Sequence, residues 1–191
     1  MPKRLKEGAA ETTVSQLAVK IRESANQIWL AGLGAFSKAR EEGVKSSMIY
    51  FEDLMIGHTA EIDRLVTDYE VVAFSRISGD TNPVHLSDKA AAQTPFKRRI
   101  AHGAYVASLI SAALGTQLPG PGTIYLSQTL TFRAPVYLGD IVRARVTVET
   151  LAIHKPIATL KTQCFVGDKL VIDGKAEVML KRRPVELAEA A

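Results

Sequence analysis

A carboxylate and an imidazole lie five residues apart in an irregular stretch of this sequence. Asp80 and His85 are the two ends of the run Asp80-Thr81-Asn82-Pro83-Val84-His85. We expect Pro83 to forbid a helix here, so that a rigid turn aims both side chains at one water molecule. Such a pair can transfer protons near neutral pH. A second interpretation stays open, in which Asp80 only satisfies backbone N–H groups of the turn and His85 is a partly buried loop residue.

The segments around this turn predict the helices that must position it. Thr67-Asp68-Tyr69-Glu70 is a capping-box pattern, which predicts a helix that runs to about Ser78 and ends at Gly79. Ser87 is expected to cap a second, short helix after the turn. Residues 103–118 carry no charge and are apolar on nearly every face. This composition predicts a helix that is buried on all sides.

Alternating apolar and polar residues predict an antiparallel sheet in the rest of the chain. The alternation occurs in residues 61–66, 124–133, 140–151, 156–166 and 169–182. In residues 140–151 the apolar side chains that point one way are Val142, Ala144, Val146 and Val148. A curved antiparallel sheet with only one long helix to cover indicates an α+β fold of the hotdog type. Because such a sheet leaves an edge to protect, we expect a homodimer.

The first part of the chain has no strand-like alternation. Residues 14–28 place apolar side chains on one face of a helix that Thr12 or Thr13 could cap, and residues 38–47 are a charged linker. We therefore predict a helical extension and linker over residues 1–47, one hotdog domain over 48–183 and a tail over 184–191.

Composition narrows the classes of function. The net charge is +4 and the basic residues are scattered, so we expect no nucleic-acid partner. Cys164 is the only cysteine, and its alternating segment predicts a small buried hydrophobe. With no secretory signal and no segment long enough to cross a membrane, we expect a cytoplasmic protein. The four histidines and one cysteine lack the spacing of metal ligands, so we expect no metal.

Several runs occur in the order in which one enzyme family has them. They are Gly79-Asp80-Thr81-Asn82-Pro83-Val84-His85, Ile100-Ala101-His102-Gly103, Ala107-Ser108-Leu109-Ile110-Ser111, Leu118-Pro119-Gly120, Ile124-Tyr125-Leu126, Phe132-Arg133-Ala134-Pro135-Val136 and Lys155-Pro156-Ile157-Ala158-Thr159-Leu160. Over residues 51–182 the chain resembles the (R)-specific enoyl-CoA hydratases of the MaoC-like type. The resemblance implies reversible hydration of a trans-2-enoyl-CoA to an (R)-3-hydroxyacyl-CoA, as in a 3-hydroxybutyryl-CoA dehydratase. It implies no cofactor, since coenzyme A is part of the substrate.

The resemblance also implies roles for individual residues. Asp80 and His85 would hold the water that adds across the double bond. Asn82 would help to position that site, or it would only be a turn residue before proline. Gly103 begins the long helix, where its N–H at the positive end of the helix dipole could hold the thioester oxygen. The alternative is that this glycine only allows close packing. Ser111 lies two turns further on and matches a family serine near the active site, although a serine in an apolar helix usually bonds back to the preceding turn.

Two further features allow either a structural or a functional interpretation. His102 matches the histidine of the family's His-Gly pair, and we expect a structural role for it. The cluster Lys97-Arg98-Arg99 could meet the phosphates of coenzyme A, but a solvated charge run is the simpler expectation.

The segment before the hotdog domain resembles a different family. Residues 21–43 are similar to the opening of phasins, which coat polyhydroxyalkanoate granules. The amphipathic helix that contains Trp29, Leu33 and Phe36 could lie on a granule surface, or it could pack on the domain or on a dimer mate. The resulting hypothesis is a granule-associated enzyme that supplies monomer for polyester synthesis. The alternatives are a non-catalytic hotdog module that binds acyl thioesters or granules, a hotdog thioesterase, and a dehydratase that acts on acyl-carrier protein.

Overall fold

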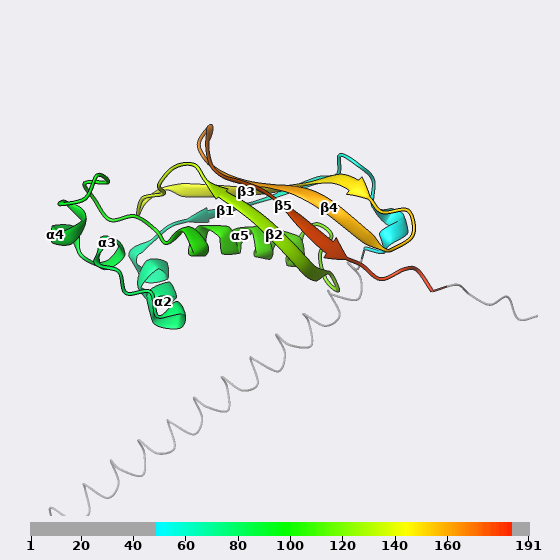
Figure 1. Cartoon of the computed structure of the whole chain (residues 1–191), viewed down its shortest axis with the longest axis horizontal. Helices are drawn as coiled ribbons and strands as arrows, with labels where there is room; N and C mark the ends of the chain where they lie inside the picture. Colours follow the sequence, from blue (N-terminus) through cyan, green and yellow to red (C-terminus); the bar gives the residue numbers. More distant parts are fainter. Residues whose placement is uncertain (1–48, 185–191) are drawn as a thin grey trace, which may run out of the picture. The chain divides into compact units, whose positions relative to one another are not determined.

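Figure 1 shows the computed structural model, in which residues 49–184 are described. The elements in chain order are η1 (Phe51–Asp53), β1 (Thr59–Leu65), α2 (Asp68–Ser78), α3 (Pro83–Leu86), α4 (Asp88–Ala91), α5 (Gly103–Thr116), β2 (Ile124–Phe132), β3 (Ile141–Leu151), β4 (Ile157–Val166) and β5 (Lys169–Met179). The helix expected within residues 1–47 lies outside the described residues, and so does the expected tail apart from Pro184. No helix among the described residues is long and apolar enough to cross a membrane.

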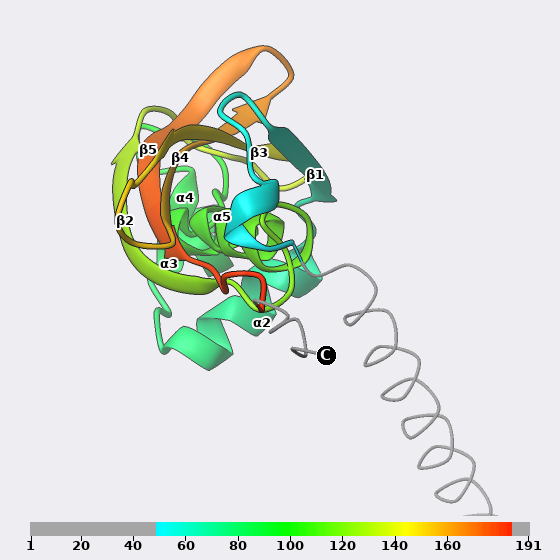
Figure 2. The same cartoon turned by 90° about the vertical axis from the view of Figure 1, so that its right-hand side faces the viewer.

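The five strands form one antiparallel sheet in the order β1-β3-β4-β5-β2. The sheet curves around α5, as the view along that helix shows (Figure 2). In β3 the four apolar residues predicted to share a face are all fully buried, while the arginines on the other face pair with acidic residues of β1. The predicted α+β hotdog arrangement is therefore confirmed.

The core lies between the concave face of the sheet and α5. Val106, Ile110 and Leu114 of α5 are each about 1% exposed, and they belong to one apolar cluster with the inward residues of the strands. Full burial of such a side chain stabilises the fold by roughly 1.5–3 kcal/mol. This packing fixes α5, and so it fixes the position of the residues at its N-terminus.

The opposite face of α5 differs from the prediction of complete burial. This face consists of small residues that are exposed in the single chain: Ala104, Ser108, Ser111, Ala112 and Gly115. The sheet curves around only one side of the helix, so it cannot cover them. The low charge of residues 103–118 thus reflects two different surfaces, a core face with large side chains and an open face with small ones.

Local hydrogen bonds and backbone geometry explain the helices α2, α3 and α4 around the predicted turn. In α2 the Thr67 N–H donates to the Glu70 carboxylate at 3.0 Å, and the helix ends at Gly79 in the left-handed region with φ 77°, as predicted. The expectation that Pro83 forbids a helix is wrong, because α3 begins at Pro83. Proline fits the first position of a helix, where its missing N–H costs no hydrogen bond. The predicted cap at Ser87 is confirmed, since its Oγ accepts from Ala90 N.

Candidate active site

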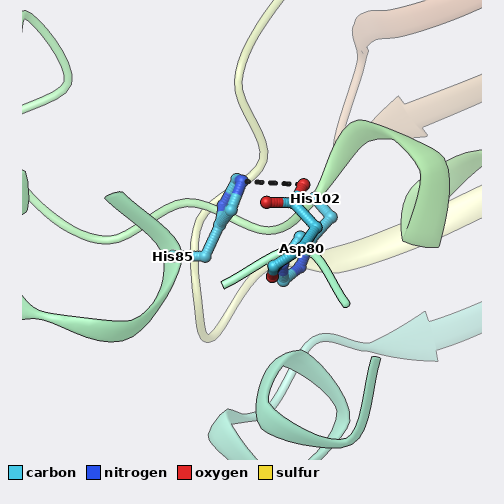
Figure 3. A group of neighbouring side chains, drawn as sticks. All are labelled: Asp80, His85 and His102. Carbon is cyan, nitrogen blue, oxygen red and sulfur yellow. Dashed lines mark hydrogen bonds and ion pairs between the residues drawn. The ribbon is translucent and has the colours of Figure 1, made fainter. Parts of the chain in front are cut away.

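The side chains of Asp80 and His85 face each other across the turn (Figure 3). Oδ2 of Asp80 lies 4.0 Å from Nε2 of His85. Nδ1 of His85 lies 2.8 Å from the carbonyl oxygen of Ile100. Because a carbonyl oxygen can only accept, Nδ1 carries the proton and Nε2 of the neutral ring is an acceptor. His85 is buried, whereas half of the Asp80 side chain is exposed. The pair thus joins an imidazole nitrogen that is fixed as an acceptor to a carboxylate that water can reach.

The turn uses the remaining polar atoms of Asp80 and Asn82. Oδ1 of Asp80 accepts from Asn82 N at 3.2 Å, while Oδ2 faces His85. The expected turn hydrogen bond of Asp80 therefore uses Oδ1, and Oδ2 is the oxygen that faces His85. Oδ1 of Asn82 accepts from Val84 N at 3.2 Å and caps α3, the helix that carries His85. In this structure Asn82 is thus a capping residue of the turn before Pro83.

His102 lies behind the pair. Its ring is 2% exposed and stacks on the ring of His85, with centroids 3.8 Å apart and planes 30° apart. Its Nε2 lies 3.0 Å from the backbone oxygen of Asp80 and 3.1 Å from Oγ of Ser75. Burial is the main cause that lowers the pKa of His102 below its ordinary value, and the nearby His85 adds to the effect.

Asp80, His85 and His102 are close enough together to be considered as metal ligands. One ligand atom from each lies within 4.8 Å of the others. In each imidazole, however, one ring nitrogen already bonds a backbone oxygen, Nδ1 of His85 to Ile100 and Nε2 of His102 to Asp80. Each neutral ring therefore has a single lone pair left for any ligand.

Arg99 holds the other end of the turn. Its Nε donates to the backbone oxygen of His85 at 2.7 Å, and its side chain also contacts the Asp68 carboxylate. The Arg99 side chain is only 13% exposed. It is therefore neither part of a solvated charge run nor free to meet a phosphate. Within the predicted basic cluster, Arg98 lies 4.0 Å above the ring of Tyr137.

Gly103 lines a cavity of about 330 Å³ at the start of α5. Its other walls are mainly apolar and include Val106, Phe132 and Ile172, with Arg133 among the lining residues. Phe132 approaches the glycine so closely that a Cβ there would lie 2.8 Å from its ring. Asp80 and His85 do not line this cavity. Segment 99–103 connects the two features, because it lines the cavity through Gly103 and contacts the acid–base pair through His102.

Ser111 is not brought to this site within the described chain. It is exposed on the open face of α5, eight residues and roughly 12 Å of helix beyond Gly103. The sequence placed it correctly on the helix, but it could not reveal which face the sheet leaves open. The contacts of Arg99 and His102 with the turn were also not predicted, since the signal in the sequence was only a basic run and a His-Gly pair.

Comparison with known proteins gives the family. A family profile described as "MaoC like domain" matches residues 57–166. The chain is 52% identical over 136 residues to a 3-hydroxybutyryl-CoA dehydratase of Methylorubrum extorquens, covering 71% of this chain and 87% of that protein. It is 47% identical over 134 residues to an (R)-specific enoyl-CoA hydratase of Rhodospirillum rubrum, covering 70% and 93%. The chain belongs to the MaoC-like family. The crystal structure of an (R)-hydratase from A. caviae, described as involved in PHA biosynthesis, matches with a TM-score of 0.65 and 48% identity over 66% of this chain and 97% of that one.

The MaoC-like domain is preceded by a segment that matches a second family. The profile of poly(hydroxyalcanoate) granule associated protein, or phasin, matches residues 11–66. The resemblance predicted from residues 21–43 is thereby confirmed. This match runs past the end of β1 and overlaps the MaoC-like match over residues 57–66.

Proposed function

We propose that the protein is a carbon–oxygen lyase that adds water to a trans-2-enoyl-CoA and reversibly forms an (R)-3-hydroxyacyl-CoA. One observation carries the proposal: Nε2 of His85, fixed as an acceptor, faces Oδ2 of Asp80 at 4.0 Å. This gap is too long for a direct hydrogen bond. A water bonded to both atoms at about 2.8 Å would subtend an angle of roughly 90°, near what its geometry allows. The pair can therefore hold the water that reacts.

The reaction needs one proton removed and one delivered. As the water oxygen bonds to C3 of the enoyl group, the Asp80–His85 pair takes the proton that the water loses. The pair then delivers a proton to C2, so it ends the turnover in the state in which it began. Negative charge that develops on the thioester oxygen would be held by the N–H of Gly103, at the positive end of α5. The apolar cavity beside Gly103 would accommodate one of the two arms that flank the thioester carbonyl.

These steps use only proton transfer and hydrogen bonding, and we therefore propose that no metal or organic cofactor takes part. Coenzyme A enters as part of the substrate. We expect the hydratase activity to survive dialysis against EDTA and to show no increase when divalent ions are added afterwards. A loss of activity that Zn²⁺ or Mg²⁺ restores would contradict this part of the proposal.

The test of the function is the loss of enoyl absorbance with crotonyl-CoA, measured together with the release of free thiol. Hydration without thiol release is expected for a lyase, whereas thiol release would indicate a thioesterase. Asp80→Asn should lower kcat by about 10²–10⁴-fold, the usual contribution of a general acid–base group. Asp88→Asn is the matched control, since Asp88 is exposed on the neighbouring α4. A fully active Asp80→Asn enzyme would remove Asp80 from the mechanism.

We also propose that two copies of the domain pair through β2. This strand is one edge of the sheet, and its exposed apolar side chains are Ile124, Tyr125, Leu126, Leu130 and Phe132. An unpaired edge of this kind favours addition of another strand, and the small residues on the open face of α5 permit close approach. Sedimentation should give the mass of two chains. Leu126→Glu should give one chain, while Ile153→Glu, at an exposed turn, should leave the dimer intact.

The N-terminal segment gives the enzyme a proposed location. We propose that residues 1–47 form an extension that binds polyhydroxyalkanoate granules from the cytoplasm, that residues 48–183 are the catalytic domain and that residues 184–191 are a tail. The enzyme would then make hydroxyacyl-CoA monomer beside the growing polymer. The phasin match over residues 11–66 supports this location. The full chain should co-sediment with isolated granules, whereas residues 48–191 should remain in solution with unchanged kcat. Equal binding of the two would refute the proposal.

A further inference from the structure

A buried histidine joins the two parts of the site but has no role in the proton transfers. His102 directly precedes Gly103 and is the N-cap residue of α5. Its Nε2 reaches the backbone oxygen of Asp80 at 3.0 Å. Its ring also lies against the ring of His85, at 3.8 Å between centroids. One side chain therefore contacts both members of the acid–base pair, and its own backbone leads into the proposed oxyanion site.

The hydrogen bonds determine the tautomer and the protonation state of the His102 imidazole. The backbone oxygen of Asp80 can only accept, so Nε2 of His102 carries the proton. Ser75 Oγ, which also donates to that oxygen at 2.8 Å, lies 3.1 Å from the same Nε2. Among the described residues, Nδ1 of His102 is buried without a hydrogen-bond partner. A proton there would have nothing to bind, so the neutral ring is the form that this site holds. A neutral ring can stack on His85 without repelling the positive charge that His85 gains in turnover.

We propose, on the basis of the hydratase function proposed above, that His102 is a positioning residue for the reaction. Its Nε2–H bond to the Asp80 carbonyl fixes the distance from the carboxylate to Nε2 of His85 and to the N–H of Gly103. His102 does not touch the reacting atoms. The hydrogen bond, and not the stacking of the rings, is the contact that matters, because His102 and Ser75 are the residues of the described chain that hold the backbone oxygen of the half-exposed Asp80.

A merely structural histidine would behave differently. If His102 only filled space in the core, an aromatic ring of similar size would serve as well. Any loss of activity would then follow the loss of stability. If His102 positions the pair, activity should follow the presence of a donor at Nε2, whatever the melting temperature. The substrate should still bind, so the loss should appear in kcat more than in KM.

The experiment compares two substitutions with opposite properties in the full-length protein. His102→Gln keeps an N–H at nearly the position of Nε2 but loses the ring, and His102→Phe keeps a ring but loses the donor. The matched control is His58→Phe, because the His58 ring accepts from Met55 N and, among the described residues, is in no hydrogen bond, ion pair or ring stack with Asp80, His85 or His102. With crotonyl-CoA, we expect His102→Phe to lower kcat by about 10–100-fold and KM to stay within about threefold, since a 1 Å misplacement of reacting groups can cost about 10²-fold. His102→Gln should stay within about fivefold of the unsubstituted enzyme.

Two results would overturn the inference. One is a folded His102→Phe enzyme with kcat within twofold of the unsubstituted enzyme, and the other is a His102→Gln enzyme as impaired as His102→Phe. If His102→Phe melts below the assay temperature, His102→Met takes its place, since it also lacks the donor. An unsubstituted enzyme that does not hydrate crotonyl-CoA would instead refute the proposed function, so the two failures are distinguishable.

Discussion

Gly103→Ala adds one methyl group beside Phe132, and we expect it to change the activity of the enzyme strongly while it leaves the stability almost unchanged. A Cβ on Gly103 would lie 2.8, 3.1 and 3.3 Å from three carbons of the Phe132 ring. Non-bonded carbons rest at about 3.5–4.0 Å, so Gly103→Ala must move the ring by roughly 0.7–1.2 Å. Phe132 is 56% exposed in the single chain, so its ring can shift without disturbing the core of its own domain.

The expected change in stability is small. Gly103 has a helical backbone, and alanine is favoured over glycine in a helix by up to about 1 kcal/mol. This gain offsets the cost of displacing a half-exposed ring. We therefore expect the free energy of unfolding of Gly103→Ala to lie within about 1 kcal/mol of that of the unsubstituted protein.

The expected change in activity is large. The displaced ring lines the cavity beside the proposed oxyanion donor, and the new methyl group occupies the approach to that N–H. A misplacement of about 1 Å can cost 10²-fold in rate, so kcat/KM for crotonyl-CoA should fall by about 10–100-fold. Urea unfolding and the loss of enoyl absorbance measure the two quantities on the same preparation.

The control for this experiment lies on the same helix. A Cβ on Gly115 would meet nothing within 4 Å, so Gly115→Ala should gain stability and keep its kcat/KM. Adding Phe132→Ala to Gly103→Ala removes the clash and should restore part of the activity. If Gly103→Ala alone keeps kcat/KM within twofold, the reasoning that places the thioester oxygen at this N–H is wrong.

Three further outcomes follow from the contacts of the site and the core. Arg99→Ala removes the donor to the part-buried backbone oxygen of His85, so it should lower the free energy of unfolding by about 1–3 kcal/mol in urea titrations. An unchanged unfolding midpoint would contradict this role of Arg99. Burial lowers the pKa of His102 in the folded protein. As the pH falls below about 6.5, the unfolded chain binds a proton at this histidine and the folded protein does not, so the stability should fall. His102→Gln should show a shallower loss of melting temperature between pH 7.5 and 5.5, and parallel curves would contradict this. Burial raises the pKa of the Cys164 thiol to about 12, so a disulfide reagent at pH 8 should label it rapidly only in denaturant, and rapid labelling of the native protein would argue against its burial.

Local chemistry allowed much of the fold to be predicted from the sequence. The capping box at Thr67 and the left-handed Gly79 act within a few residues of chain, and α2 has the predicted bounds. The alternation in β3 depends only on the two-residue repeat of a strand, and it gave the correct inward face. The error at Pro83 also has a local cause, since proline is excluded from the interior of a helix but not from its first position.

Contacts between distant segments could not be predicted in this way. The pairing of β2 with β5, which makes β2 an edge strand, depends on the whole sheet. It also determines which face of α5 stays open and therefore where Ser111 lies. The same is true of Arg99, whose partners are 14 and 31 residues away. A charge run in the sequence shows the type of its side chains but not the segment that each one meets.

The five consecutive residues 99–103 contact both the Asp80–His85 pair and the N-terminus of α5. Segment 99–103 binds the backbone oxygens of Asp80 and His85, accepts from the His85 ring, and ends at the Gly103 N–H. The proposed acid–base pair and the proposed oxyanion donor are therefore connected by the backbone of this short segment and not by the whole sheet. Small movements of the strands would carry both parts together. On this basis, substitutions within segment 99–103 should lower kcat more than equally buried substitutions elsewhere in the domain, for the same loss of stability.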